Sequence, residues 1–268
     1  MTEECIHGLD LDRCDICSPK AKAAPVTASP ARTRRPSSSP ASASPRRRES
    51  PQPKGKPVIL AEQRVQHLTH IDNLTGILVD GALHADADPA WQGRPEIDIS
   101  SPDTRNARRG TDIAGTGRTV ADHVPFFLSP DATIWEGMLA RTPDPRLAPR
   151  ARALPATEFI MLVTTIKQLV PLDGPYPVVA DGDAADARTR FATTKEDSER
   201  LLRRLLTSDD GVLLRAELLV PEPVPFERIS LIGVANERAR ADVRELLAGS
   251  AHQPRVAVHP PWFALATP

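Results

Sequence analysis

The stretch QHLTHIDNLTGILVDGAL, residues 66–83, decides how the fold begins in this chain of 268 residues. Residues 65–71, VQHLTHI, read as a strand. Asp72 stands where a helix N-cap is expected, and Gly81 suits the position just after the last helical turn. The stretch therefore predicts a strand followed directly by a short amphipathic helix.

Two histidines, His67 and His70, fall at this strand-to-helix junction. Their spacing does not fit a zinc protease, because no glutamate lies between them and they do not share a helical turn. The chain also lacks the G-x-S-x-G motif of a serine hydrolase. We expect His67 to point from the strand end into a cleft, where a neutral imidazole can bind a sugar or an amide.

The remainder of residues 58–268 predicts an α+β domain with a mixed sheet. Residues 85–119, rich in Asp, Arg, Gly and Pro, predict a loop. Strands are expected at 123–129, 157–166, 175–181, 212–220, 228–235 and 255–263. Helices are expected at 131–141, 195–206 and 236–249.

Residues 1–18 predict a small zinc-binding module. All three cysteines lie in this segment together with a histidine: Cys5, His7, Cys14 and Cys17. Three thiolates and one imidazole suit tetrahedral zinc, and metal ligation would give so short a segment a reason to fold. The alternative is an unfolded end with reactive thiols.

Residues 19–57 predict a disordered linker, because Pro, Ser, Ala and Arg dominate and large apolar side chains are almost absent. Its arginine clusters, Arg34–Arg35 and Arg46–Arg48, could hold a polyanion in a salt-dependent way. The alternative is a soluble spacer.

Composition indicates the cellular compartment but not the binding partner. The formal net charge is −1, so the charge of the whole chain predicts no partner. No apolar run approaches the length of a membrane span, and the acidic N-terminus does not resemble a secretory signal. We therefore expect a cytoplasmic protein with reduced thiols and no membrane partner.

Glu217 and a group of arginines are the remaining candidates for chemistry. Glu217 interrupts the apolar run LLRAELLV, although simple alternation would place it on the solvent face together with Arg215. Arg105, Arg108 and Arg109 cluster where a pyrophosphate could bind, and the alternative is a solvated loop.

Taken in order, HLTHIDNLTGIL, DTRNARR…ADHVPFFLSP and RAELLV resemble the DarT-type DNA ADP-ribosyltransferase toxin family. The resemblance covers roughly residues 62–263, including RISLIGVANE and RVAVHPPWF near the end. It implies a mixed sheet split around an NAD cleft. It also implies transfer of ADP-ribose from NAD to a nucleobase in single-stranded DNA, and a macrodomain antitoxin as partner.

The resemblance assigns roles to individual residues. Glu217 matches the catalytic glutamate and Arg105 best matches the catalytic arginine, with Arg108 and Arg109 as alternatives. Phe126 and Phe127 would form a stacking wall. The residues implied to bind NAD are His67, Leu68, Thr69, Gly76, His84 and Arg105, with Leu83 as an alternative to His84.

Two departures concern the acceptor. The family commonly shows DYVPFYF where this chain has DHVPFFL, and the segment before Glu217 is shorter and lacks Trp and Tyr. NAD use is therefore better supported than the target. Two other hypotheses stay open: a transferase that modifies RNA or protein, and a non-catalytic zinc-bearing or nucleic-acid-binding protein.

Overall fold

The computed structural model describes residues 58–91, 94–170, 174–221 and 223–265. The expected zinc module (1–18) and linker (19–57) lie outside these residues. Within the described ranges, no helix is long and apolar enough to cross a membrane.

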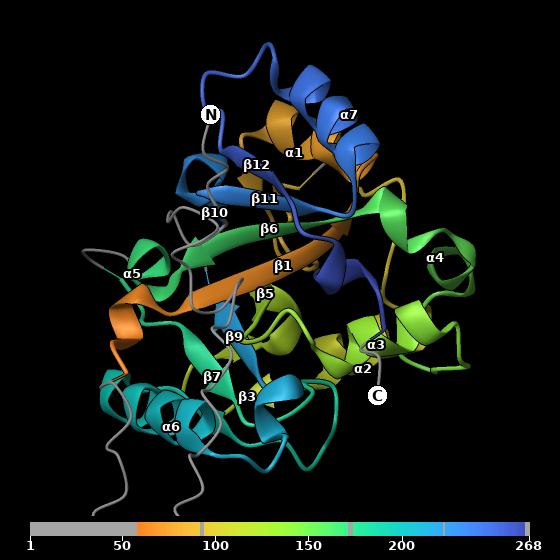
Figure 1. Cartoon of the computed structure of the whole chain (residues 1–268). Coiled ribbons are helices and arrows are strands. Elements are labelled where there is room, and N and C mark those ends of the chain that lie inside the picture. Colours follow the sequence, from red (N-terminus) through yellow and green to blue (C-terminus); the bar gives the residue numbers. More distant parts are fainter. Residues whose placement is uncertain (1–57, 92–93, 171–173, 222, 266–268) are drawn as a thin grey trace, which may run out of the picture. The chain divides into compact units, whose positions relative to one another are not determined.

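An eight-stranded mixed sheet organises the domain (Figure 1). The strand order is β12-β11-β6-β1-β5-β9-β7-β8, and among these described strands only β11 and β12 pair in parallel. The strands of this sheet are β1 (Arg64–His70), β5 (Val124–Phe127), β6 (Phe159–Thr165), β7 (Val178–Ala180), β8 (Phe191–Ala192), β9 (Glu217–Val220), β11 (Leu231–Val234) and β12 (Arg255–Val258). Two short antiparallel pairs join β2 (Ala82–Leu83) to β10 (Val224–Pro225) and β3 (Asp112–Ile113) to β4 (Arg118–Thr119). The expected α+β class with a mixed sheet is confirmed.

The sheet is split between β1 and β5. These strands share a single register pair, Gln66 with Phe127. β1 otherwise pairs along its full length with β6, whereas β5 pairs with β9. The two halves of the sheet therefore join only at the C-terminal end of β5, which leaves space between them on one face.

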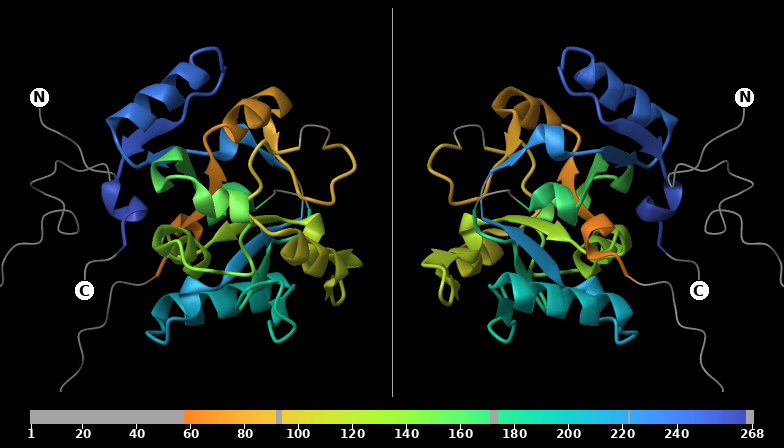
Figure 2. Two further views of the ribbon diagram at one scale, coloured as in Figure 1. Left: turned by 90° about the vertical axis from the view of Figure 1, so that its right-hand side faces the viewer. Right: turned by 90° about the vertical axis from the view of Figure 1, so that its left-hand side faces the viewer.

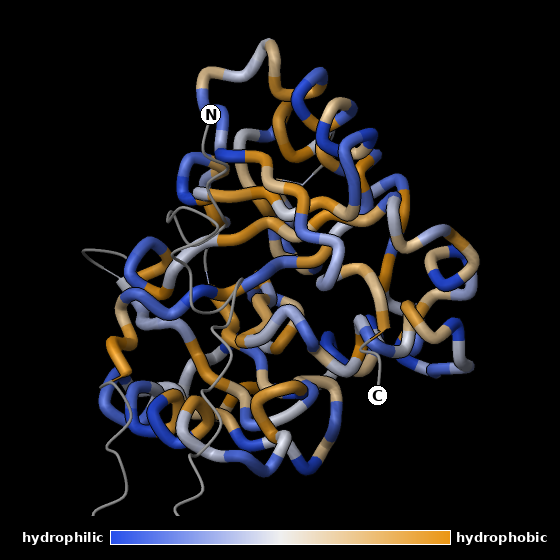
Figure 3. Tube along the Cα trace, viewed as in Figure 1, coloured by the Kyte–Doolittle hydropathy of each residue, from blue (hydrophilic) through white to orange (hydrophobic). Residues whose placement is uncertain are grey.

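Helices cover the two ends of the sheet and one side of the split (Figures 1 and 2). The helices are α1 (Asn73–Asp80), α2 (Pro102–Gly110), α3 (Thr133–Ala140), α4 (Pro149–Ala153), α5 (Ile166–Leu169), α6 (Lys195–Thr207) and α7 (Glu237–Leu247). α7 packs on β11 and β12, and α6 packs on β7 and β8 at the opposite end. Hydrophobic and hydrophilic residues alternate along both helices (Figure 3), and the buried ones include Leu202 and Leu205 on α6 and Val243 and Leu247 on α7.

The strand-to-helix junction forms as expected, with one difference. Gly81 ends α1 with a φ of 68°, the left-handed conformation that favours glycine. Asp72, however, makes no side-chain hydrogen bond to the helix start. Its backbone N–H instead donates to Nδ1 of the buried His70, 3.2 Å away. His70 therefore belongs to the packing of the junction.

Two other expectations are wrong in part. Residues 85–119 contain a helix, α2, where a loop was expected. Ser101 caps α2 by accepting from Thr104 N–H, and Pro102 occupies the first turn, where a missing N–H costs nothing. The expected strand 212–220 begins with a 3-10 turn at Val212–Leu214, so that Glu217 is the first residue of β9.

Gly233 in β11 is a position where the fold requires glycine. A Cβ there would lie 2.5 Å from the ring of Trp262. We expect Gly233→Ala to lower the free energy of unfolding by about 1–3 kcal/mol through overpacking, measured by urea denaturation. Gly249→Ala is the matched control, because nothing lies within 4 Å of its Cβ position. Equal stability of the two variants would contradict this account.

Candidate active site

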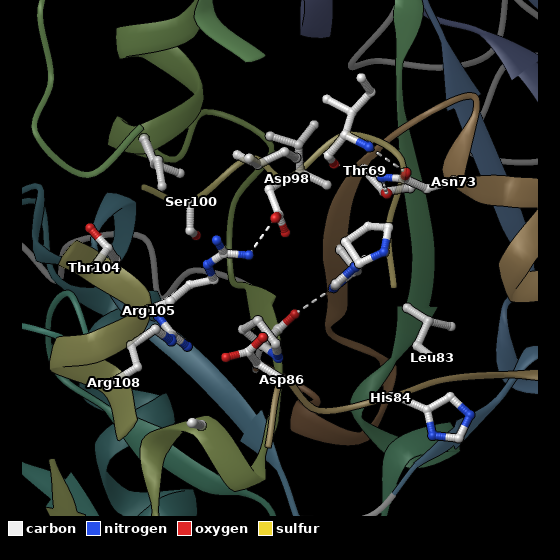
Figure 4. A pocket seen from close by; sticks show the side chains of 18 of the residues that line it. Thr69, Asn73, Leu83, His84, Asp86, Asp98, Ser100, Thr104, Arg105 and Arg108 are labelled. Atoms are coloured by element: carbon white, nitrogen blue, oxygen red, sulfur yellow. Dashed lines mark hydrogen bonds and ion pairs between the residues drawn. The ribbon is translucent and has the colours of Figure 1, made fainter. Parts of the chain in front are cut away.

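A cavity of about 470 Å³ lies on the open face of the split, within the size range of small-molecule sites. β1, α1, α2, β5 and β9 all contribute side chains to it (Figure 4). It brings together residues that the sequence had singled out: His67, Leu68, Thr69, Gly76, Leu83, His84, Arg105, Arg108 and Glu217. Arg109 is not among its lining residues.

Glu217 lies on the floor of this cavity with only 3% of its surface exposed. Oε1 accepts from the Ala184 N–H over 2.9 Å. The Arg108 guanidinium donates to both oxygens, with 3.3 Å to Oε1 and 2.9 Å to Oε2. The solvent-face position with Arg215 that alternation suggested is therefore wrong. A buried carboxylate is tolerated here because it is paired.

Arg108 is held by the same pair. Its burial would lower its pKa, but the charge of Glu217 and the hydrogen bonds to it outweigh this effect and raise the pKa above its usual value. The arginine is therefore always charged, and its forked donors fix the plane of the carboxylate.

The three arginines of α2 have three different partners. Arg105 pairs with Asp98 and faces the cavity (Figure 4). Arg108 pairs with Glu217, and Arg109 pairs with Asp86. Positions 105 and 108 are one helical turn apart and share a face, which explains why both enter the cavity.

The His67 side chain on β1 contacts β5 across the split in the sheet. Its Nδ1 lies 2.9 Å from the carbonyl oxygen of Pro125 on β5, so Nδ1 carries the proton and donates. Burial lowers the pKa of His67 below its usual value, more than the bond to Pro125 raises it. A neutral imidazole therefore presents its Nε2 lone pair as an acceptor.

α1 and the loop after β2 form the wall beside His67. Asn73 ties Thr69 to this wall, because its amide donates to Thr69 Oγ1 and exchanges two hydrogen bonds with Ile97. A Cβ added at Gly76 would meet nothing within 4 Å, so the backbone of α1 is open to the cavity. The NAD-binding role of Gly76 stays a prediction.

His84 belongs to a stack of flat groups. Its ring lies parallel to that of Trp91, with centroids 6.2 Å apart, and Arg94 lies 5.0 Å over Trp91. His84 Nδ1 also lies 2.8 Å from Asp88 Oδ2, and this hydrogen bond is the main cause that lowers the pKa of Asp88. Trp91 lines the cavity and was missed in the sequence, because no periodic pattern surrounds it.

The two phenylalanines of β5 lie on opposite faces of the sheet. Phe127 lines the cavity, opposite Glu217 in the β5–β9 ladder. Phe126 is fully buried in the core on the other face, so the expectation that it forms a stacking wall is wrong. Alternation along the strand accounts for the difference.

The part of the chain that the structure describes holds no group of three or more His, Cys, Asp or Glu side chains placed to bind a metal ion. The predicted ligands Cys5, His7, Cys14 and Cys17 lie outside that part. Zinc binding therefore stays a prediction.

We expect the melting temperature to fall as the pH is lowered from 7.5 to 5.5. Below pH about 6.5 an unfolded histidine gains a proton, whereas folded His67, with its lowered pKa, resists protonation, so the unfolded state binds more protons. His67→Asn should reduce this fall, because its amide can still donate to Pro125 without titrating in this range. An equal fall in both proteins, measured by calorimetry, would contradict the assignment.

Comparisons with known proteins identify the family to which the chain is similar. A family model described as ssDNA thymidine ADP-ribosyltransferase, DarT, matches residues 66–264. A DNA ADP-ribosyl transferase of Mycobacterium tuberculosis (strain H37Rv) is 28% identical over 201 residues, which cover 68% of this chain and 81% of that protein.

Solved structures share the fold. The DarT of Thermus sp. 2.9 in complex with ADP-ribosylated ssDNA gives a TM-score of 0.62 at 22% identity and covers 75% of this chain and 96% of that one. Its complex with NAD+ gives 0.59 at 21% identity, with 75% and 97% covered. Thermosipho africanus DarTG in complex with ADP-ribose gives 0.59 at 17% identity, with 75% and 51% covered.

The split sheet and its cavity thus define an NAD-dependent DNA ADP-ribosyltransferase. Because the family model covers most of its length, the chain belongs to the DarT family. The resemblance stated from the sequence motifs is confirmed.

Proposed function

We propose that this chain transfers ADP-ribose from NAD to thymidine in single-stranded DNA, with Glu217 as the catalytic carboxylate. The observation that carries the proposal is the buried Glu217, which Arg108 and the Ala184 N–H hold in the cavity that His67 and Thr69 also line. The thymidine target rests on the description of the matching family.

In this reaction the bond between the ribose C1′ and the nicotinamide nitrogen breaks, and nicotinamide leaves with the bonding electrons. The ribose then carries oxocarbenium-like positive charge until the acceptor base bonds to C1′ and loses a proton. A carboxylate fixed near C1′ stabilises this charge, and it costs little reorganisation because its partners already hold it. We assign this role to Glu217, because Arg108 and the Ala184 N–H already hold its carboxylate in the cavity, and we assign it the orientation of a ribose hydroxyl as well.

The arginines divide the remaining work in our proposal. Arg105, which faces the cavity from α2, binds the diphosphate of NAD or activates the acceptor base. Arg108 orients Glu217 through its two hydrogen bonds. His67, Leu68, Thr69, Gly76 and His84 form the NAD-binding wall on β1, α1 and the following loop.

We further propose that the protein is a cytoplasmic bacterial toxin whose partner is a macrodomain antitoxin that removes the modification. Support comes from membership of the DarT family and from the fold shared with a DarTG protein solved with ADP-ribose. Expression of the chain alone should halt growth, and expression with a macrodomain should restore it.

The direct test uses purified protein and NAD labelled in the adenosine moiety. We expect label on single-stranded oligonucleotides that contain thymidine and none on matched oligonucleotides without it. RNA and total protein serve as parallel acceptors. Label on RNA or protein alone would favour a transferase that modifies RNA or protein. The absence of both label and nicotinamide release would end the proposal.

For the N-terminal segment we propose one structural zinc ion per chain, bound by Cys5, His7, Cys14 and Cys17. The ligand set supports this proposal. Elemental analysis of protein purified without chelator should give about one zinc per chain, as four ligands bind one ion. The zinc content of the variant with both Cys14→Ser and Cys17→Ser should be close to zero. Unchanged zinc content in that variant would contradict the ligand assignment.

A further inference from the structure

Unsatisfied polar atoms gather at the cavity. Within the described residues, four buried side-chain nitrogen or oxygen atoms lack a hydrogen bond: Gln66 Oε1, Asp86 Oδ2, Arg105 Nε and His123 Nε2. Three of these atoms belong to residues that line the cavity, although Asp86 Oδ2 is also ion-paired with Arg109. Arg105 Nε and His123 Nε2 are then the two described atoms at the cavity that have no partner. Since buried polar groups are rarely left unpaired, such a concentration points to a ligand that supplies the missing partners.

His123 is the more constrained of these two residues. Only 2% of its surface is exposed, and its Nδ1 lies 2.9 Å from the carbonyl oxygen of Thr119. A carbonyl can only accept, so Nδ1 carries the proton and Nε2 keeps its lone pair. The structure therefore fixes the tautomer of this ring.

The turn that holds His123 is itself locked. Asp122 Oδ2 accepts from the Thr119 N–H over 2.7 Å and from Thr119 Oγ1 over 2.8 Å. These two bonds fix the residue whose carbonyl holds the imidazole. His123 directly precedes β5, and it lines the cavity together with Pro125 and Phe127, which alternate along that strand. The orientation of the ring is thus built into the backbone.

The surroundings keep this imidazole neutral. Burial is the largest cause that lowers the pKa of His123, and the positive charges of Arg118 and Arg108 lower it further. The bond to Thr119 and the charge of Asp122 act in the opposite direction but are outweighed. At neutral pH the ring therefore offers an acceptor at Nε2 and has no second proton to give.

We propose that His123 is a substrate-binding residue whose Nε2 accepts a hydrogen bond from an N–H group on a heterocyclic substrate. The inference rests on the proposed function, which supplies two substrates of this chemistry, namely NAD and a DNA base. Both can present an amide-type or ring N–H to a fixed acceptor. An apolar ring at this position would keep the packing but would offer the N–H no partner.

The test compares His123→Phe, which keeps a ring but removes the acceptor, with His123→Gln, which keeps an acceptor near the position of Nε2. We expect the Phe variant to raise the KM of one substrate about tenfold, as the loss of one hydrogen bond implies, with the KM of the other unchanged. The Gln variant should stay within about threefold of wild type, because part of the bond survives. A rise in the KM of NAD, measured by transfer of labelled ADP-ribose at saturating oligonucleotide, identifies NAD as the source. A rise only in the KM of the oligonucleotide identifies the DNA base.

Unchanged KM values in a folded His123→Phe protein would overturn the proposal. Because that variant could fail to fold, the wild-type protein labelled with ¹⁵N-histidine provides a second measurement. The Nε2 resonance of His123 should move when NAD or single-stranded DNA is added alone, and no movement with either would also overturn the proposal. This binding readout needs no turnover, so it separates a failure at His123 from a failure of the proposed reaction.

Discussion

Replacing Glu217 with glutamine is expected to lower the rate of ADP-ribose transfer about a thousandfold, which is the scale for removing one preorganised electrostatic group from a water-poor site. The amide that Glu217→Gln introduces could still accept from the Ala184 N–H through its oxygen. It would carry no negative charge to stabilise the ribose cation. The measurement is single-turnover transfer of labelled ADP-ribose to a thymidine-containing oligonucleotide.

Glu196→Gln is the matched control, because Glu196 is exposed on α6 and does not line the cavity. The same isosteric change there should leave the transfer rate unaltered. If Glu217→Gln kept more than about a tenth of the wild-type rate, the loss would be too small for the charge effect expected of a catalytic carboxylate.

The second large effect is expected at Arg108. Arg108→Ala leaves the Glu217 carboxylate buried without its charged partner, and breaking such a pair typically costs about 3–5 kcal/mol of unfolding free energy. Because Arg108 is partly exposed, we expect the lower part of this range. Transfer should also fall by about a hundredfold, since Glu217 loses the group that orients it. Urea denaturation and the transfer assay measure the two effects separately.

A double-mutant cycle measures the interaction energy between Arg108 and Glu217. The variant with both Arg108→Ala and Glu217→Ala should be more stable than Arg108→Ala alone, because no unpaired charge is left buried, while transfer stays lost. Arg200→Ala provides the control, because the Arg200 side chain is 77% exposed and pairs with Asp197 on the surface of α6. Additive losses of stability in the cycle would mean that the two residues are not coupled.

The hydrophobic pattern was sufficient to predict much of the sheet. β6 begins with the apolar run 159–163 and lies almost entirely buried in the middle of the sheet, and α1 follows the apolar spacing and glycine signal of residues 72–81. These elements are predictable because their side chains meet the core in a repeating order.

The pattern failed at α2 for an equally physical reason. None of its residues is buried, so it has no apolar stripe to reveal a helical period. The sequence Ser101-Pro102-Asp103, an N-cap followed by proline and an acidic first turn, was the signal that could have identified it.

Local sequence patterns could not predict the ion pair between Arg108 and Glu217. Arg108 and Glu217 are 109 positions apart in the chain, and no periodicity relates them. Alternation within LLRAELLV even favoured an exposed Glu217, because it ignored the turn that precedes β9. Only the ordered motifs shared with a family pointed to this residue as functional.

The hydrogen bond from Ala184 to Glu217 has a consequence for the segment between β7 and β8. That bond ties the backbone of this segment to the carboxylate, and Asp183 next to it pairs with Arg146. A ligand that draws Glu217 away from the Ala184 N–H must therefore loosen the segment. By thermodynamic reciprocity, anything that binds and immobilises the segment favours the present orientation of the carboxylate. The segment between β7 and β8 is thus coupled to the orientation of Glu217, and amide exchange at Ala184 would report the strength of that coupling.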